Sequence, residues 1–323
     1  MADHAVDNEF DGDIFIYRGG RAPQHITHAR IDESVDEIGD DAFRFCENLL
    51  TVDTHDGIRK VGMRAFRDCT SLRRINLKSV VDIGYESFYG CESLQYVEFG
   101  DRLETIGSNA FRDCYSLKHL KLPSIIAIGT YAFCECTGMA DIELSERLER
   151  IGRIAFWQCH RLQRIAIPLK RNLFVYDNTD QEYSQFGGCE QLTTDIVGGI
   201  HKTVASLHMQ SWRTEMNEEI NRINQVLPSI SSWQMSNVIR RWMESLLDKM
   251  DHYKAEHCRY VKEGMTLLEL ALWKAKLGES EEYAAEGKSK KAKVDAESYR
   301  RDKRMTCGAD MVIKNVLPFL QLK

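Results

Sequence analysis

Cysteine is the residue whose number and spacing in this chain could support chemistry. The 323 residues include ten cysteines, and six of these recur at steps of 23, 22, 23, 22 and 23 residues. Regularly spaced thiols could form disulfides, bind a metal or stack as small buried side chains. Because the acidic N-terminal sequence shows no secretory signal, we expect a reducing compartment and a ladder of buried, reduced thiols. The six are Cys46, Cys69, Cys91, Cys114, Cys136 and Cys159.

The familiar catalytic motifs are missing from the sequence. It contains no GxSxG, GxxxxGK[ST], HExxH or CxxC pattern. His252 and His257 are five residues apart, which does not give the same-face i, i+4 spacing of a helical zinc pair. Cys134 and Cys136 form only a C-x-C, and Cys136 already belongs to the regular series. We therefore expect no catalytic residues, no cofactor and no metal site.

The cysteine series belongs to a longer repeat, which must position it. An Ile-Gly or Val-Gly pair recurs with the same steps, and a phenylalanine follows each pair. A period in the low twenties is typical of a solenoid, in which each repeat buries its apolar face only by stacking on its neighbours. We expect the phenylalanines to form an internal aromatic ladder. The pairs begin at Ile38, Val61, Ile83, Ile106, Ile128 and Ile151, and the phenylalanines are Phe43, Phe66, Phe88, Phe111, Phe133 and Phe156.

The order Ile-Gly, Ala-Phe, Cys, Leu, Ile, Leu resembles the BspA-type leucine-rich repeat family over residues 26 to about 197. The expected fold class is α+β. A β-rich solenoid of about six to seven repeats of 22 or 23 residues would precede an α-helical hairpin or bundle. The resemblance implies a binding scaffold, often found on cell surfaces. Together with its C-terminal helical region, the chain is similar to a set of leucine-rich repeat proteins found in diatoms.

The N-terminal part of the chain is expected to divide into a leader and the solenoid. Residues 1–12 are acidic and are predicted to be a disordered leader. The solenoid is predicted over residues 13–197, with residues 13–36 as a hairpin that caps its first open edge. The repeat is interrupted by an insertion at 168–185. This insertion is either a binding loop or a terminal repeat that adapts to its neighbour.

The C-terminal part changes from the repeat period to a helical period. We predict a helical hairpin over 198–278, with a long second helix that begins near Trp233. An acidic linker is expected over 279–289, followed by C-terminal helices over 290–323. The basic run from Lys288 to Arg304 could be a nuclear localisation signal or a nucleic-acid contact. Acidic residues within this run favour a solvated helix instead.

Two columns of outward-facing strand positions form the candidate binding surface. The inward positions are nearly constant between repeats, whereas these positions vary in charge and size. An ordinary solvated face also varies, but Tyr and Arg are enriched at interaction hot spots. The first column is Thr51, Arg74, Tyr96, His119, Asp141 and Arg164, and the second is Asp53, Asn76, Glu98, Lys121, Glu143 and Ala166. The predicted partner-binding residues are Arg74, Tyr96, His119, Asp141, Arg164, Asn76, Glu98, Lys121 and Glu143.

Composition and charge narrow the functions that remain. The net charge of −6 makes nucleic acid an unexpected partner, and no run of 18 apolar residues predicts a membrane span. We predict a non-enzymatic, cytoplasmic or nuclear scaffold that binds an unidentified protein through its sheet face. The helical region would dock a partner or oligomerise as a coiled coil. The alternatives are a structural homo-oligomer through the long helix and a nuclear or nucleic-acid-associated factor through residues 288–304.

Overall fold

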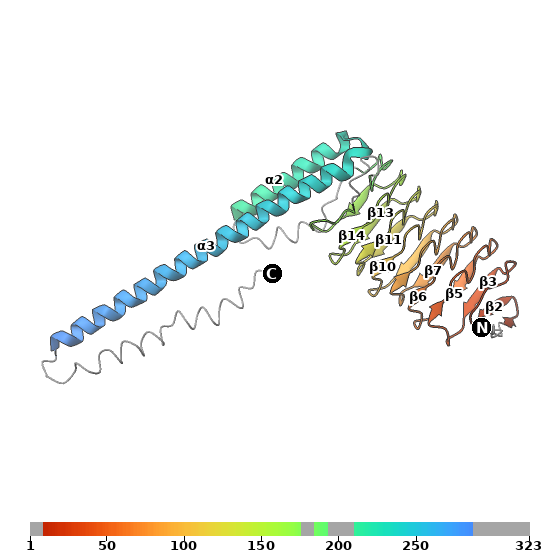
Figure 1. Cartoon of the computed structure of the whole chain (residues 1–323), viewed down its shortest axis with the longest axis horizontal. Coiled ribbons are helices and arrows are strands. Elements are labelled where there is room, and N and C mark those ends of the chain that lie inside the picture. Colours follow the sequence, from red (N-terminus) through yellow and green to blue (C-terminus); the bar gives the residue numbers. More distant parts are fainter. Residues whose placement is uncertain (1–8, 176–183, 193–209, 287–323) are drawn as a thin grey trace. The chain divides into compact units, whose positions relative to one another are not determined.

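The computed structural model describes residues 9–175, 184–192 and 210–286 (Figure 1). The chain forms two compact units, residues 1–247 and 248–323. The first contains a solenoid of parallel strands followed by helices, which confirms the α+β class. The second contains the remainder of the long helix that begins in the first.

The first side of the solenoid carries its longer strands. Six form one sheet in the order β1-β2-β3-β5-β7-β9, and three form a second sheet in the order β11-β13-β15. All pairs are parallel except β1 with β2. From β3 onward, alternate side chains point inward and are apolar, so each of these strands buries one face, whereas all three residues of β1 are exposed. The strands are β1 Glu9–Asp11, β2 Ile14–Tyr17, β3 His28–Ile31, β5 Thr51–Asp53, β7 Arg74–Leu77, β9 Tyr96–Phe99, β11 His119–Leu122, β13 Asp141–Leu144 and β15 Arg164–Ala166.

The second side is a ladder of two-residue strands, each followed by the repeated glycine. Its order is β14-β12-β10-β8-β6-β4, and all neighbours are parallel. The glycine allows the preceding turn of backbone to approach closely, because a Cβ on Gly129 would lie 2.4 Å from the amide nitrogen of Ser108. The strands are β4 Glu37–Ile38, β6 Lys60–Val61, β8 Asp82–Ile83, β10 Thr105–Ile106, β12 Ala127–Ile128 and β14 Arg150–Ile151.

The third side consists of turns that also bond to one another. The amides of Phe66 and Asp68 donate to carbonyls of the next repeat at 2.7 Å each. Full repeats have two left-handed residues here, such as Asn109 (φ 56°) and Asp113 (φ 61°). Asn and Asp tolerate this conformation, whereas the β-branched Ile154 (φ 57°) does so at a steric cost. Hydrogen bonds between repeats therefore close all three sides of the solenoid.

The predicted aromatic ladder fills the core. Successive phenylalanine rings stack nearly parallel, with centroids 5.0 to 5.8 Å apart from Phe43 to Phe186. Tyr17 closes the N-terminal end, with its ring 4.9 Å from that of Phe43. Phe186 adds a seventh ring beyond those of the six regular repeats. The rings are almost fully buried, so the ladder is the continuous apolar centre of the fold.

The predicted thiol ladder is also confirmed, with an additional bond at each step. The six repeat cysteines and Cys189 are free and buried. From Cys69 onward, each of these thiols donates to the carbonyl oxygen of the phenylalanine one repeat earlier, at 3.0 to 3.2 Å. Burial raises the pKa of Cys46 to about 11 and that of Cys114 well above its ordinary value. The thiols therefore act as neutral donors that connect neighbouring repeats.

The expected N-terminal boundaries are wrong in two respects. Glu9–Asp11 is the strand β1, because Phe10 packs on Phe15 at 5.5 Å and Arg18 bonds Glu9 at 2.6 Å. The leader predicted over 1–12 therefore does not hold for residues 9–12, while residues 1–8 lie outside the description. Residues 13–36 are also not a hairpin, since β2 and β3 are parallel. The antiparallel cap is formed by β1 and β2.

The predicted insertion at 168–185 begins as part of a terminal repeat. Leu173 and Phe174 are buried, and Phe174 forms a parallel bridge with Ile151. The amide of Val175 donates to the Ile151 carbonyl at 3.0 Å, which extends the second side by one step. Residues 176–183, the centre of the insertion, lie outside the described part of the chain. The described part thus serves packing.

The described part of the helical region contains α2, Gln210–Val226, and a short 3-10 turn, η1, Leu227–Ser229. The long helix α3 then runs from Ser232 to Glu286. Its first turn docks on the last repeat, where the Ser232 hydroxyl accepts from the Gly188 amide at 3.1 Å. Ser184 and Ser236 join their hydroxyls at 2.7 Å in the same contact. The solenoid is therefore closed at this end by a helix.

The acidic linker expected over 279–289 is wrong for residues 279–286, which are helical. Glu and Ala favour helices, and Gly278 disfavours the helix by only about 1 kcal/mol relative to Ala. This segment is therefore a continuation of α3 rather than a linker. Residues 198–209 of the expected hairpin, and the C-terminal helices expected over 290–323, lie outside the described residues.

Candidate partner-binding face

The predicted columns lie side by side on the long-strand side of the solenoid. In the first column Arg74 is opposite Tyr96, and Asp141 is between His119 and Arg164. The second column pairs Asn76 with Glu98 and Lys121 with Glu143. Eight of the nine predicted binding side chains are exposed, and Asp141 is half-buried. The structure therefore brings the predicted residues together on one accessible surface, which we call the sheet face.

Charges on the sheet face are partly paired across strands. His119 Nδ1 lies 2.5 Å from Asp141 Oδ2, and Lys121 Nζ lies 3.4 Å from Glu143 Oε2. Glu98 contacts Lys78 at 2.8 Å. Such exposed ion pairs contribute only about 0 to 1 kcal/mol to the stability of the fold. A partner protein can therefore break them and form its own ion pairs with these side chains at a small free-energy cost. The sheet face thus presents charges of both signs in exchangeable pairs.

Tyr96 is the most prominent apolar group on this face. It is 56% exposed on β9, the last strand of the six-stranded sheet, where its backbone is held by parallel pairing with β7. Arg74 is its direct neighbour on β7. Tyr and Arg combine large contact area with hydrogen-bonding ends, which suits the centre of an interface.

A groove beside the sheet face was not predicted from the sequence. It has a volume of about 490 Å³, and it shares only His119 with the predicted residues. It spans four consecutive repeats, from Gln95 before β9 to Arg161 before β15. The sequence feature that could have predicted the groove is the small size of Gly138 and Ala140, because the other repeats have larger residues at these positions. The lining residues are Gln95, Tyr115, Ser116, Lys118, His119, Gly138, Ala140 and Arg161.

The turn side carries a cluster that serves structure rather than recognition. Glu86 contacts both Arg64 and Arg67, and Arg67 also stacks over the ring of Tyr89 at 4.8 Å. Burial alone would raise the pKa of Glu86, but the hydrogen bond from Tyr85 and the arginine charges hold it below its ordinary value. These side chains form ion pairs and ring contacts with one another, and the contacts connect neighbouring repeats.

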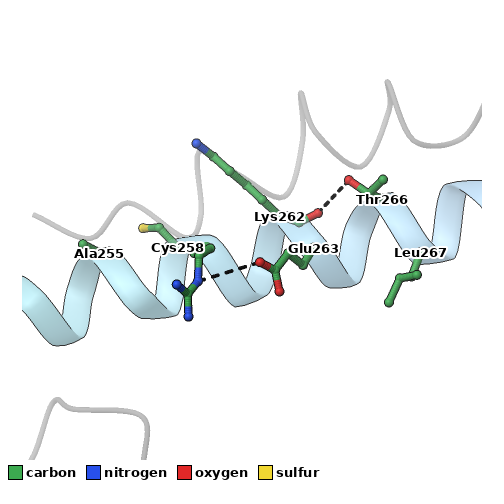
Figure 2. Close-up of a pocket in the computed structure, with 7 residues that line it drawn as sticks. Ala255, Cys258, Lys262, Glu263, Thr266 and Leu267 are labelled. Carbon is green, nitrogen blue, oxygen red and sulfur yellow. Dashed lines mark hydrogen bonds and ion pairs between the residues drawn. The ribbon is translucent and has the colours of Figure 1, made fainter.

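A second hollow runs along one side of α3, as Figure 2 shows. Its lining residues recur at helical spacing from Ala255 to Leu267. Its polar groups are engaged within the helix: Arg259 faces Glu263 at 3.7 Å, and Thr266 donates to the Lys262 carbonyl at 2.9 Å (Figure 2). Cys258, the exposed cysteine of this region, also lies here. The hollow is an open helix surface without an arrangement suited to catalysis.

The described residues contain no group of three or more His, Cys, Asp or Glu side chains positioned to bind a metal. Within the same residues, no helix has the length and apolar character required for a membrane span. The basic segment 288–304 lies outside the description.

The three-sided stack of 22- and 23-residue turns, with internal phenylalanine and cysteine ladders, defines a leucine-rich repeat solenoid. A profile of the BspA type leucine-rich repeat region, with six copies, matches residues 22–124 and 77–193. These overlapping matches span more than half of the 323 residues. The chain belongs to the BspA-type leucine-rich repeat family.

Solved structures of bacterial leucine-rich repeat proteins are similar to this chain. A leucine-rich repeat protein of T. pallidum is 25% identical, with 65% of this chain and 96% of that chain covered and a TM-score of 0.49. One from Bacteroides ovatus is 24% identical over 52% of this chain and 48% of that chain, with a TM-score of 0.41. The pneumococcal vaccine antigen PcpA is 21% identical over 45% and 51%, respectively, with a TM-score of 0.32. No curated protein matches this chain.

Proposed function

We propose that the protein is a non-enzymatic interaction scaffold that binds a partner protein through the sheet face. The observation that carries this proposal is the exposed Tyr96, beside Arg74, on a sheet held by hydrogen bonds and by a stacked core. A preorganised surface binds without a large loss of conformational entropy, so its exposed side chains can contribute directly to affinity. The proposed location is cytoplasmic or nuclear.

A pull-down from native lysate tests the sheet face directly. We expect wild type to capture specific proteins that are lost by the variant Arg74→Ser, Tyr96→Ser, His119→Ser and Arg164→Ser. All four side chains are exposed, so the variant should keep the wild-type circular dichroism spectrum and unfolding midpoint. Loss of an exposed hot-spot residue weakens binding by about 2 kcal/mol or more, which is roughly 30-fold.

The matched control changes exposed residues on another side of the solenoid. Lys60→Ser, Met63→Ser and Arg150→Ser alter the second side and the turn that follows it. This control should capture the same proteins as wild type. If the sheet-face variant also captures that same set, the columns are an ordinary solvated surface and the proposal fails.

A second candidate function is self-association through α3. It is supported by an exposed apolar stretch in which Leu267 is 68% exposed. Exposed apolar patches of this kind mark association surfaces. The stretch comprises Leu267, Leu268, Leu270, Leu272 and Trp273.

Light scattering during size-exclusion chromatography tests this candidate. Wild type should form dimers in a concentration-dependent way, and Leu267→Glu with Leu270→Glu should shift it to monomer. Tyr96→Ser provides a control that should leave the mass unchanged. A wild type that stays monomeric at the highest accessible concentration would exclude self-association through α3.

A further inference from the structure

The groove beside the sheet face exists because one repeat carries two small side chains. At the first position, where the fifth repeat has Gly138, every other full repeat has a larger residue. The first position lies two residues after the repeat cysteine, and the second lies four residues after it. At the second position the fifth repeat has Ala140, and every other full repeat again has a larger residue. The first-position residues are Asn48, Ser71, Ser93, Ser116 and Arg161, and the second-position residues are Leu50, Arg73, Gln95, Lys118 and Gln163. The larger side chains of the neighbouring repeats therefore form the walls of the groove, and Gly138 and Ala140 form its base.

The backbone around the groove contributes to the same opening. Gln95 precedes β9 and Lys118 precedes β11, and these two strands belong to separate sheets. The ladder resumes immediately afterwards, where the Ala140 amide donates to the Lys118 carbonyl at 2.8 Å. A continuous ladder would hold the two strands about 4.8 Å apart. The interruption releases that constraint at the end of the groove that Gln95 lines.

The groove is lined by positive charge. Lys118 and Arg161 are cationic, His119 is basic, and none of the eight lining residues is acidic. Asp141 binds His119 at the rim, which leaves Lys118 and Arg161 as the charges that set the sign of the interior. Lysine and arginine bind carboxylates through short, charge-assisted hydrogen bonds.

The remaining walls suit a small group on an aliphatic stem. Tyr115 offers a ring that is 40% exposed, and Ser116 and Gln95 add hydrogen-bonding groups. Burial, followed by the charges of Asp113 and Glu135, raises the pKa of Tyr115, so these two carboxylates lie near this wall of the groove. Their charge disfavours a dianionic phosphate more strongly than a singly charged carboxylate.

We propose that this groove receives a glutamate or aspartate side chain of the partner protein, with Lys118 and Arg161 as its charge partners. Tyr115 packs against the methylene stem of that side chain. This inference deepens the proposed function and rests on it, because the groove adjoins the sheet face through His119.

Peptide binding to the full chain tests the chemistry of the groove. At an ionic strength of about 0.15 M, where the Debye length is about 8 Å, a fluorescent acetyl-tetraglutamate amide should bind wild type, and the tetraglutamine analogue should not. Lys118→Ser with Arg161→Ser should weaken binding about tenfold or more, which corresponds to the loss of one charge-assisted hydrogen bond. The control Lys60→Ser with Arg150→Ser removes the same two charges elsewhere and should leave the affinity within about twofold, as expected for distant charges screened by salt. Equal binding of both peptides, or equal loss in both variants, would overturn the inference.

Ala140→Gln provides a steric test that leaves the charge unchanged. Glutamine occupies the same repeat position at Gln95 and Gln163, so the substitution should fold normally while filling the groove. It should abolish glutamate-peptide binding; wild-type affinity would overturn the inference.

The pull-down separates the proposal of a protein-binding sheet face from the proposal of an acid-binding groove. A partner lost by the four-residue sheet-face variant but kept by Ala140→Gln would support the scaffold and contradict the groove, whereas a partner kept by both would contradict both.

Discussion

Raising the pH from 7.5 to 9.5 is expected to unfold the solenoid. Seven buried thiols have a raised pKa, with Cys46 at about 11 and Cys134 at about 12. An unfolded cysteine ionises near pH 8.5, so above that pH the unfolded state loses protons that the folded state keeps. The stabilisation by neutral thiols is thus complete below about pH 8.5 and is lost as the pH rises toward 11 and beyond.

The size of this effect follows from the number of thiols. Each contributes a loss of about 1.4 kcal/mol one pH unit above its unfolded pKa, so seven together lose about 10 kcal/mol. That loss is comparable with the whole stability of a typical domain, about 5 to 15 kcal/mol. The seven are Cys46, Cys69, Cys91, Cys114, Cys134, Cys136 and Cys159.

Urea unfolding midpoints at pH 7.5, 8.5 and 9.5, under reducing conditions, measure this dependence. The double variant Cys114→Ala with Cys136→Ala is the control, because it removes two ionising groups. Its stability should fall less steeply with pH, by about 1.4 kcal/mol per pH unit for each thiol removed. A wild-type midpoint that stays constant up to pH 9.5 would show that the thiols do not couple folding to pH.

Replacing Phe111 with alanine is expected to destabilise the protein by about 3 to 5 kcal/mol. Its ring stacks on Phe88 at 5.0 Å and on Phe133 at 5.4 Å, and Phe99 meets it edge-on at 6.1 Å. The loss includes apolar burial and the cavity left between two repeats. In a repeat array each turn is stabilised mainly by its neighbours, so a gap in the middle weakens the coupling between both halves.

Thermal and urea unfolding of Phe111→Ala can be compared with those of Tyr96→Ala. Both substitutions remove an aromatic ring from the same part of the solenoid, but Tyr96 is exposed and should change stability by no more than about 0.5 kcal/mol. Hydrogen exchange should also become faster in the repeats on either side of Phe111. Equal destabilisation by the two substitutions would contradict a core based on the phenylalanine ladder.

The ladders and the sheet face were predictable because repetition multiplies a weak local signal. A single Phe or Cys says little, but the same residue at Phe88, Phe111 and Phe133 can face only the shared interior. The outward columns follow from the same alternation. The thiol bonds to carbonyls one repeat earlier were not predictable, since they depend on the exact stacking of neighbouring turns.

Features that depart from the average repeat were predicted poorly. β1 was missed because three residues that include Glu9 and Asp11 look like a solvated leader, although their backbone bonds to β2. The groove was missed because it depends on absent side chains at Gly138 and Ala140 and on a break between two strands. Such features arise from differences between adjacent repeats. Aligning the repeats by the residues that they share does not reveal these differences.

Site-specific photo-crosslinking tests the central claim of a protein-binding sheet face most directly. Benzoylphenylalanine would replace Tyr96 on that face and, in a separate protein, Tyr85, which is 39% exposed at the turn after β8. The Tyr96 position should yield a discrete crosslinked partner in native lysate, competed by unlabelled wild type but not by the four-residue sheet-face variant. A Tyr96 position that gives no adduct, or only the adducts seen at Tyr85, would contradict the assignment of this face to partner binding.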